Sequence, residues 1–180
     1  MTTPYFSDTL IDTIKTRGTK KILSKGQFLI KEGDIEKNLY FVESGAVRAF
    51  LLSELEELTI RFGYEGSIIN SLSSFIKGTP SEFYIDAIRK TTVRIISKEN
   101  VYQLVHRDSD SMQQYIILLE VLITQQIERE IDLLTASPTE RLKRVLERSP
   151  NLFQQIPLKY IASYLRMQPE TLSRIRKFLI

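Results

Sequence analysis

The segment from Ser109 to Thr135 constrains the fold most, because it lacks glycine and proline and its apolar residues recur every three or four positions. This period predicts one continuous helix of about 26 residues and about 40 Å. One apolar stripe along it comprises Met112, Ile116, Leu119, Ile123, Ile127, Ile131 and Leu134. A second stripe of Tyr115, Leu118 and Leu122 makes the first half of the helix apolar nearly all round. Two surfaces must therefore cover this helix.

We expect a β-domain to cover one face of the helix and a second copy of the helix to cover the other. The predicted seam of this homodimer consists of Met112, Ile116, Leu119, Ile123 and Ile127. A core helix of a monomer is the alternative interpretation of the same pattern.

The chain from Lys20 to about Ser97 reads as short runs rich in β-branched and aromatic residues, separated by turn residues. The predicted strands are 21–23, 27–30, 38–43, 46–52, 58–63, 83–87 and 92–96. Many short strands of this kind predict an antiparallel β-roll resembling a jelly roll. Three short helices are predicted around them, over 5–16, over 71–77, and from the capping residue Ser97 to Val105.

The sequence Ser137-Pro138-Thr139-Glu140 predicts the start of a helix that ends before Pro150. The expected fold class is therefore α+β, with three parts. These are a β-roll sensor domain over 1–108, a dimerisation helix over 109–136 and a helical C-terminal domain over 137–180.

Composition excludes several kinds of chemistry. The chain has no cysteine and one histidine, His106, so thiolate metal sites and multi-histidine cages are excluded. We expect no catalytic residue, no metal and no cofactor, and a jelly-roll enzyme is rejected for lack of metal-binding side chains. The sequence lacks an apolar run of roughly 18 residues and the pattern of a signal peptide, so we expect a cytoplasmic protein with no membrane partner.

Positive charge is concentrated near the C-terminus. Residues 136–180 hold nine Lys/Arg and three Asp/Glu, whereas residues 1–135 hold 16 and 19. A basic segment on an acidic body is typical of proteins that bind nucleic acid, although a solvated basic surface is the plainer alternative.

Two short helices are predicted within this basic segment, over 158–165 and 169–179, with Arg166-Met167-Gln168 between them. A joint of this length is that of a helix-turn-helix. The second helix presents Glu170, Arg174 and Lys177 on one face, where they could read bases in a major groove. The predicted phosphate contacts are Lys159, Arg166, Thr171, Ser173 and Arg176. An amphipathic hairpin with solvated charges is the alternative.

The stretch IASYLRMQPETLSRIRKFL resembles the helix-turn-helix of the catabolite-activator (Crp/Fnr) family of regulators. Phe28–Phe50 is similar to the first half of the cyclic-nucleotide-binding β-roll in that family, with Gly33 and Gly45 at its tight turns. The resemblance spans nearly the whole chain. It implies a homodimeric transcription regulator that binds double-stranded DNA and RNA polymerase.

The sequence departs from the family pattern in two places near the C-terminus. Arg166 stands where the turn usually has glycine, at a cost of about 1 kcal/mol for the left-handed conformation. The sequence ends at Ile180, where a β-wing usually follows, so a branch without a wing is expected.

The family's phosphate-binding cassette is altered in a third place. Its Gly-Glu pair falls on Asn70 and Ser71, and its Arg-Ser pair falls on Ser81 and Glu82. Without the arginine there is no bidentate clamp for a cyclic phosphate, and Glu82 adds a repelling charge. We therefore expect that the β-roll has lost cyclic-nucleotide binding and that its effector, if any, is different. A ligand-binding or protein-interaction module of the same fold, without DNA binding, is the alternative function.

Overall fold

The computed structural model describes residues 8–179. Its N-terminal part contains the helices α1 (Asp8–Arg17) and α2 (Leu72–Lys77) and the strands β1 (Thr19–Leu23), β2 (Phe28–Ile30), β3 (Asn38–Ser44), β4 (Ala46–Leu52), β5 (Glu57–Tyr64), β6 (Ile68–Ile69), β7 (Tyr84–Ala87) and β8 (Thr91–Ser97). The helices α3 (Lys98–Val105), α4 (Ser109–Leu134), α5 (Pro138–Arg148), α6 (Leu152–Gln155), α7 (Leu158–Tyr164) and α8 (Pro169–Leu179) follow. No helix in the described range is long and apolar enough to cross a bilayer.

The strands form two four-stranded sheets, in the orders β1-β8-β3-β6 and β2-β7-β4-β5, and every pairing is antiparallel. Apolar side chains from both sheets meet in one buried cluster, including Leu23, Tyr40, Val42, Val47, Ile85 and Val93. This is the β-roll that the short, regularly spaced strands predict.

Strand β3 is buried on both faces, because alternate side chains of a strand point to opposite sides. Tyr40 and Val42 point into the roll. Leu39 and Phe41 belong to a second cluster on the outer face of their sheet, which α1, α3 and α4 cover. The continuous apolar run in this strand therefore reflects two partners instead of one.

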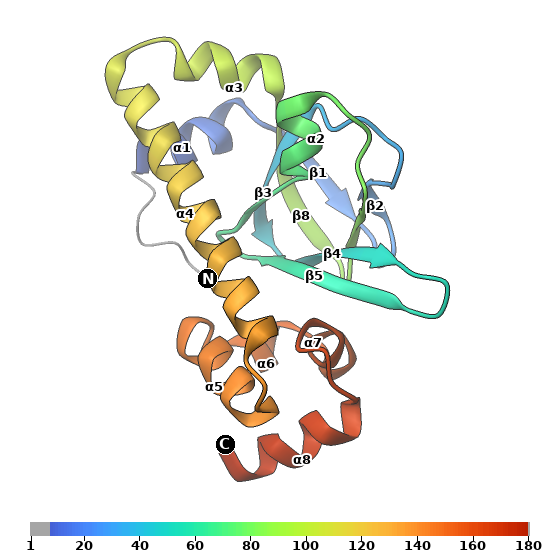
Figure 1. Ribbon diagram of the computed structural model, residues 1–180. Coiled ribbons are helices and arrows are strands. Elements are labelled where there is room, and N and C mark those ends of the chain that lie inside the picture. Colours follow the sequence, from blue (N-terminus) through green and yellow to red (C-terminus); the bar gives the residue numbers. More distant parts are fainter. Residues whose placement is uncertain (1–7, 180) are drawn as a thin grey trace.

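Helix α4 runs along the roll and continues down to the C-terminal helices (Figure 1). Leu118 and Leu122 are buried against the outer face of the roll, whereas Ile123 and Ile127 remain more than half exposed, at 57% and 51%. One of the two predicted apolar faces is thus covered within the chain and the other is not.

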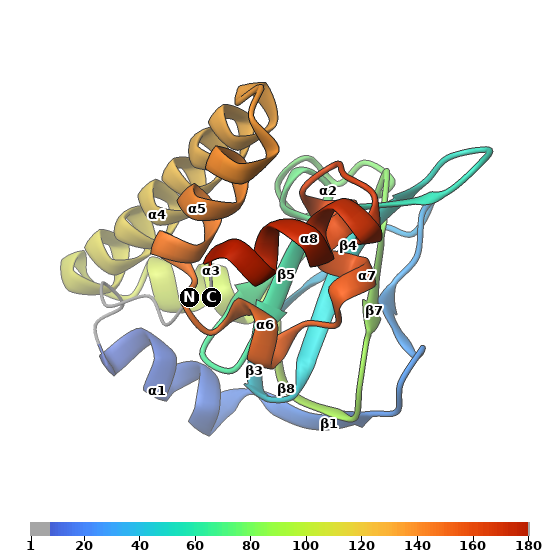
Figure 2. The same ribbon diagram turned by 90° about the horizontal axis from the view of Figure 1, so that it is seen from below.

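The C-terminal helices pack on one another and on the roll (Figure 2). Leu142 and Val145 of α5, Ile161 of α7 and Leu172 of α8 share a buried cluster that also contains Ala46 of β4. The third cluster therefore joins the C-terminal helices to the β-roll.

The predicted strands and the predicted helices within the described range are confirmed, and no end within that range differs by more than two residues. Residues 5–7 of the predicted first helix lie outside the described range. The sequence reasoning missed β6, which has only two residues, and α6, which has four. Elements this short carry no periodic signal.

The predicted helix starts are also confirmed. The side chain of Ser97 accepts a hydrogen bond from the amide of Asn100, and the side chain of Ser137 accepts one from the amide of Glu140. Pro138 occupies the first turn of α5. These caps satisfy amide groups that would otherwise lack partners at the helix ends.

Two turn glycines adopt the left-handed conformation, as the sequence predicts. The φ angle is +87° at Gly33 and +88° at Gly45. Their surroundings differ, because a Cβ at Gly45 would lie 2.5 Å from the carbonyl oxygen of Lys90, whereas one at Gly33 would meet nothing within 4 Å.

This difference predicts unequal losses of stability. Gly45→Ala should lower the free energy of unfolding by about 3 kcal/mol, since overpacking adds to the cost of the left-handed conformation. Gly33→Ala, the matched control, should cost about 1 kcal/mol. Urea unfolding of both variants measures the difference, and equal losses would contradict it.

Candidate functional site

The turn between α7 and α8 has the geometry of a tight helix-helix joint. Arg166 has a φ of 53°, the only positive φ among the described residues other than glycine, which confirms the predicted left-handed turn. Its neighbour Met167 donates a backbone hydrogen bond to the carbonyl oxygen of Ala162, at 3.0 Å. Arg141 of α5 donates to the carbonyl oxygens of Leu165 and Thr135, and so ties the turn to the end of α4.

The apolar faces of the two helices meet as predicted. Ile161, Ala162 and Leu165 of the first helix and turn are buried together with Leu172 and Ile175 of α8. The small side chain of Ala162 lies in this contact. The side chain of Leu179, which the sequence reasoning also placed there, lies outside the description.

The three predicted base-reading residues, Glu170, Arg174 and Lys177, are all exposed on α8. In the described part of the chain, none of their charged groups has an ion-pair partner. The face is therefore open to an external ligand.

The residues predicted to contact phosphate lie around this face. Lys159, Arg166 and Arg176 are exposed, whereas Thr171 and Ser173 are half-buried. Two of the cations lie over aromatic rings, Lys159 at 4.6 Å from the ring centre of Tyr160 and Arg176 at 4.6 Å from that of Phe153.

Helix α7 is attached to the β-roll by contacts that the sequence does not predict. The hydroxyl of Ser163 accepts a hydrogen bond from the amide of Thr59 in β5 and donates one to the carbonyl oxygen of Glu57, both at 2.9 Å. The rings of Phe62 and Tyr164 lie 5.2 Å apart. These contacts hold α7 on β5 and leave α8 on the side away from the roll.

A buried arginine of the roll strengthens this attachment. The guanidinium of Arg48 lies over the ring of Tyr160 at 4.3 Å and pairs with Asp86 and Glu57. The two carboxylates compensate the charge that burial would otherwise disfavour, and they raise the pKa of Arg48 against the opposing effect of desolvation.

The four cassette positions lie close together around the start of α2. Ser71 and Ser81 are buried and their hydroxyls form a hydrogen bond of 2.9 Å. Asn70 is partly buried and donates weakly to the carbonyl oxygen of Asn38, at 3.5 Å, whereas Glu82 is exposed. None of the four is an arginine, so no guanidinium is provided there for a phosphate.

The sequence reasoning missed Glu36, which lies beside this cassette and is only 2% exposed. Its Oε1 accepts hydrogen bonds from the amide of Asn38 and the hydroxyl of Tyr40, whereas its Oε2 has no partner among the described residues. Burial raises the pKa of Glu36. No sequence signal marks this residue, because it follows a turn in a stretch with several exposed charges.

Along α4, the predicted seam residues are not all alike. Ile116, Ile123 and Ile127 are exposed, and Leu119 is half-buried. Met112 packs partly against the cluster under the roll. The exposed stripe continues through Ile131 and Leu134 to the end of the helix.

One protein-family model matches part of this chain. Residues 20–108 match the family described as cyclic nucleotide-binding domain. The matched range contains the stretch Phe28–Phe50. A search of curated proteins returned no match.

Solved structures of bacterial regulators share the fold over nearly the whole chain. A variant of CooA from Carboxydothermus hydrogenoformans is 18% identical with a TM-score of 0.76, covering 99% of this chain and 85% of that chain. FixK2 from Bradyrhizobium japonicum is 22% identical with a TM-score of 0.75, covering 90% and 84%. The c-di-GMP responsive global regulator CLP of Xanthomonas campestris is 17% identical with a TM-score of 0.71, covering 96% and 91%. Residues 20–108 thus match the cyclic nucleotide-binding domain family, and the chain shares its fold with these three solved structures.

Proposed function

We propose that the protein is a sequence-specific DNA-binding transcription regulator, with α8 inserted into the major groove. The observation that carries this proposal is the exposed face of Glu170, Arg174 and Lys177 on a helix whose opposite face is buried. Arginine can bind guanine through two hydrogen bonds, and glutamate can accept one from the amino group of cytosine. The exposed cations Lys159 and Arg166 flank this face and supply phosphate contacts.

The proposed division of the chain assigns the β-roll sensor to 1–108, the dimerisation helix to 109–136 and the DNA-binding domain to 137–180. Supporting this, α4 connects the roll to the C-terminal helices in a single uninterrupted element (Figure 1). Because α7 is hydrogen-bonded to β5, a movement of the roll would change the position of α7 and of the adjoining α8.

We also propose that two copies pair through the exposed stripe of α4. Five large apolar residues along one face of a helix are costly to leave in water: Ile116, Ile123, Ile127, Ile131 and Leu134. A two-fold dimer would place two α8 helices for half-sites about 34 Å apart on the duplex.

The cassette supports the further proposal that the roll no longer takes cyclic nucleotides in the family's way. The hydroxyls of Ser71 and Ser81 bond to one another, and Glu36 adds a buried carboxyl group next to them. A cyclic phosphate would meet repulsion there instead of a guanidinium whenever this carboxyl is ionised.

Cyclic AMP should therefore leave the melting temperature of the protein unchanged. A ligand present at 100 times its dissociation constant would add about 2.7 kcal/mol to the free energy of unfolding, which thermal unfolding detects easily. A saturable upward shift of the melting temperature with cyclic AMP would contradict the loss of the cassette.

The DNA-binding proposal predicts different effects for two cations. Arg174→Ala should cost about 1–3 kcal/mol on the preferred site and relax the preference at one position of each half-site. Lys159→Ala should weaken binding to all sequences alike. It should also reduce the slope of log K against log salt concentration by about one unit per site. Selection from a random DNA library, followed by titrations at several salt concentrations, measures both. A preferred motif without two-fold symmetry, or an Arg174→Ala protein with unchanged preference, would refute the proposal.

The dimer predicts that replacing Ile123 and Ile127 together by lysine gives a monomer, because unpaired charges would be buried in the seam. Analytical ultracentrifugation measures the change. Thr124→Lys, which adds a charge to the same helix outside the stripe, should remain a dimer. A double variant that sediments as the wild type does would place the interface elsewhere.

A further inference from the structure

A cavity lies where β5, α4, α5 and α7 meet. It has a volume of about 80 Å³, room for a few water molecules or one small oxyanion. None of Asn70, Ser71, Ser81 and Glu82 lines it. The cavity is therefore distinct from the four cassette positions.

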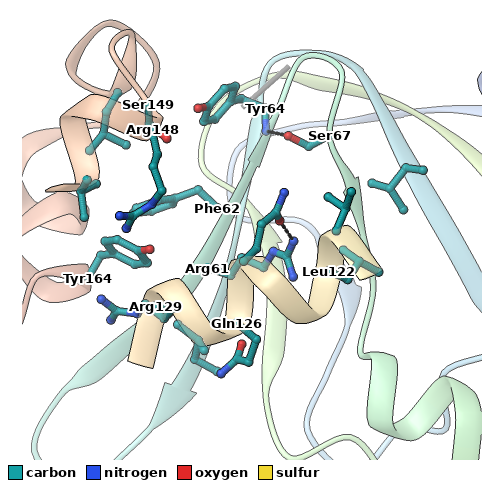
Figure 3. Close-up of a pocket in the computed structure, with 16 residues that line it drawn as sticks. Arg61, Phe62, Tyr64, Ser67, Leu122, Gln126, Arg129, Arg148, Ser149 and Tyr164 are labelled. Atoms are coloured by element: carbon teal, nitrogen blue, oxygen red, sulfur yellow. Dashed lines mark hydrogen bonds between the residues drawn. The ribbon is translucent and has the colours of Figure 1, made fainter. Parts of the chain in front are cut away.

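The lining of this cavity is positively charged. Among residues 8–179, the charged side chains that line it are Arg61 of β5, Arg129 of α4 and Arg148 of α5, and none of the lining residues is an aspartate or glutamate. Figure 3 shows these arginines around the rings of Phe62 and Tyr164. Three guanidinium groups from three separate elements thus converge on one small space.

Of the three, Arg129 has the most buried donor atoms without a hydrogen-bond partner among the described residues. It is 6% exposed, and its Nε and Nη1 have no hydrogen-bond partner among the described residues. The guanidinium lies over the ring of Tyr164, at 3.7 Å from the ring centre. One face of the guanidinium therefore contacts the ring, while N–H donors in the plane of the guanidinium remain available. Desolvation lowers the pKa of Arg129, as it does that of Arg61.

The nearby carboxylates of Glu128 and Asp132 form ion pairs with Arg144 and Arg148, not with Arg129 or Arg61. Asp132 is fully buried. The region therefore holds four positive charges, on Arg61, Arg129, Arg144 and Arg148, and two negative charges, on Glu128 and Asp132. Two positive charges are left without a counter-charge. Arg61 has a single neutral partner, because it donates to the side-chain oxygen of Gln125.

We propose that this cavity binds a small oxyanion, either free phosphate or the phosphoryl group of a small metabolite. A phosphate oxygen can accept from Arg129 and Arg61 at once, and the dianion offsets the two uncompensated charges. Buried, unpaired arginine is expensive to maintain without such a partner. Neutral side chains around the space, including Gln126, Ser149 and Tyr164, can complete the hydrogen bonds.

Occupancy would join β5, α4 and α7 through one ligand and so hold the α7–α8 pair against the roll. This regulatory consequence rests on the proposed function. Binding of the anion itself does not, and it is measured without DNA, so the two proposals can fail independently.

The experiment is thermal unfolding of the full chain against increasing inorganic phosphate, with sodium chloride keeping the ionic strength constant. We expect a saturable rise in melting temperature for the wild type. Glycerol 3-phosphate in a second arm distinguishes the sources: a rise with both indicates a phosphoryl site, and a rise with phosphate alone indicates the free ion.

Arg129→Met tests the site directly. It should lose the phosphate-dependent rise while its melting temperature without phosphate stays equal to or above that of the wild type, since it removes an unpaired buried charge. Arg61→Met should weaken the rise from a different element. Lys20→Met, which removes an exposed cation on β1, should keep it in full.

Two outcomes would overturn the proposal. One is the absence of a saturable rise in the wild type. The other is an equal rise in Arg129→Met, because phosphate also stabilises proteins by exclusion from their surface, and that effect needs no site.

Discussion

Helix α4 is the element on which the rest of the structure depends, because its faces have different partners along its length. Leu118 and Leu122 bury apolar area against the roll in its first half. In the second half, Asp132 is buried in ion pairs with Arg144 and Arg148 of α5. The helix therefore changes from an apolar contact to a charged one where it leaves the sheet, and this change positions the C-terminal helices below the roll.

The ion pairs between α4 and α5 fix the orientation of the C-terminal helices relative to α4. A hydrophobic face tolerates sliding, whereas a buried carboxylate must meet its guanidinium groups in one geometry. With α5 held on α4, the cluster around Leu142 and Ile161 closes, and Ser163 reaches the backbone of β5. The orientation of α8 follows from this chain of contacts. The polar face of α8 points to solvent because its apolar face is buried in this cluster.

Charge is distributed differently at the cassette and in the cavity where β5, α4, α5 and α7 meet. The cassette region contains hydroxyls and the buried Glu36, and the junction contains arginines. A pocket selects ligands by the charge it cannot otherwise compensate. Under the two proposals, an anion is disfavoured at the cassette and favoured in the cavity where β5, α4, α5 and α7 meet. Both features depend on buried ionisable groups with unfilled hydrogen-bonding capacity.

The sequence by itself determined the local structure and the order of the elements. Periodicity of apolar residues predicts α4 and the strands, Gly45 predicts its left-handed turn, and Ser137 predicts the start of α5, because each depends on neighbours a few residues away. It also predicts which face of α8 is polar. The tertiary structure alone decided which polar groups meet: the backbone amide of Glu36 donates to the hydroxyl of Ser74, and the amide of Thr59 donates to the hydroxyl of Ser163, which is 104 residues away. Arginines such as Arg129 look like surface residues in the sequence, since their burial depends on elements far apart in the chain that fold against them.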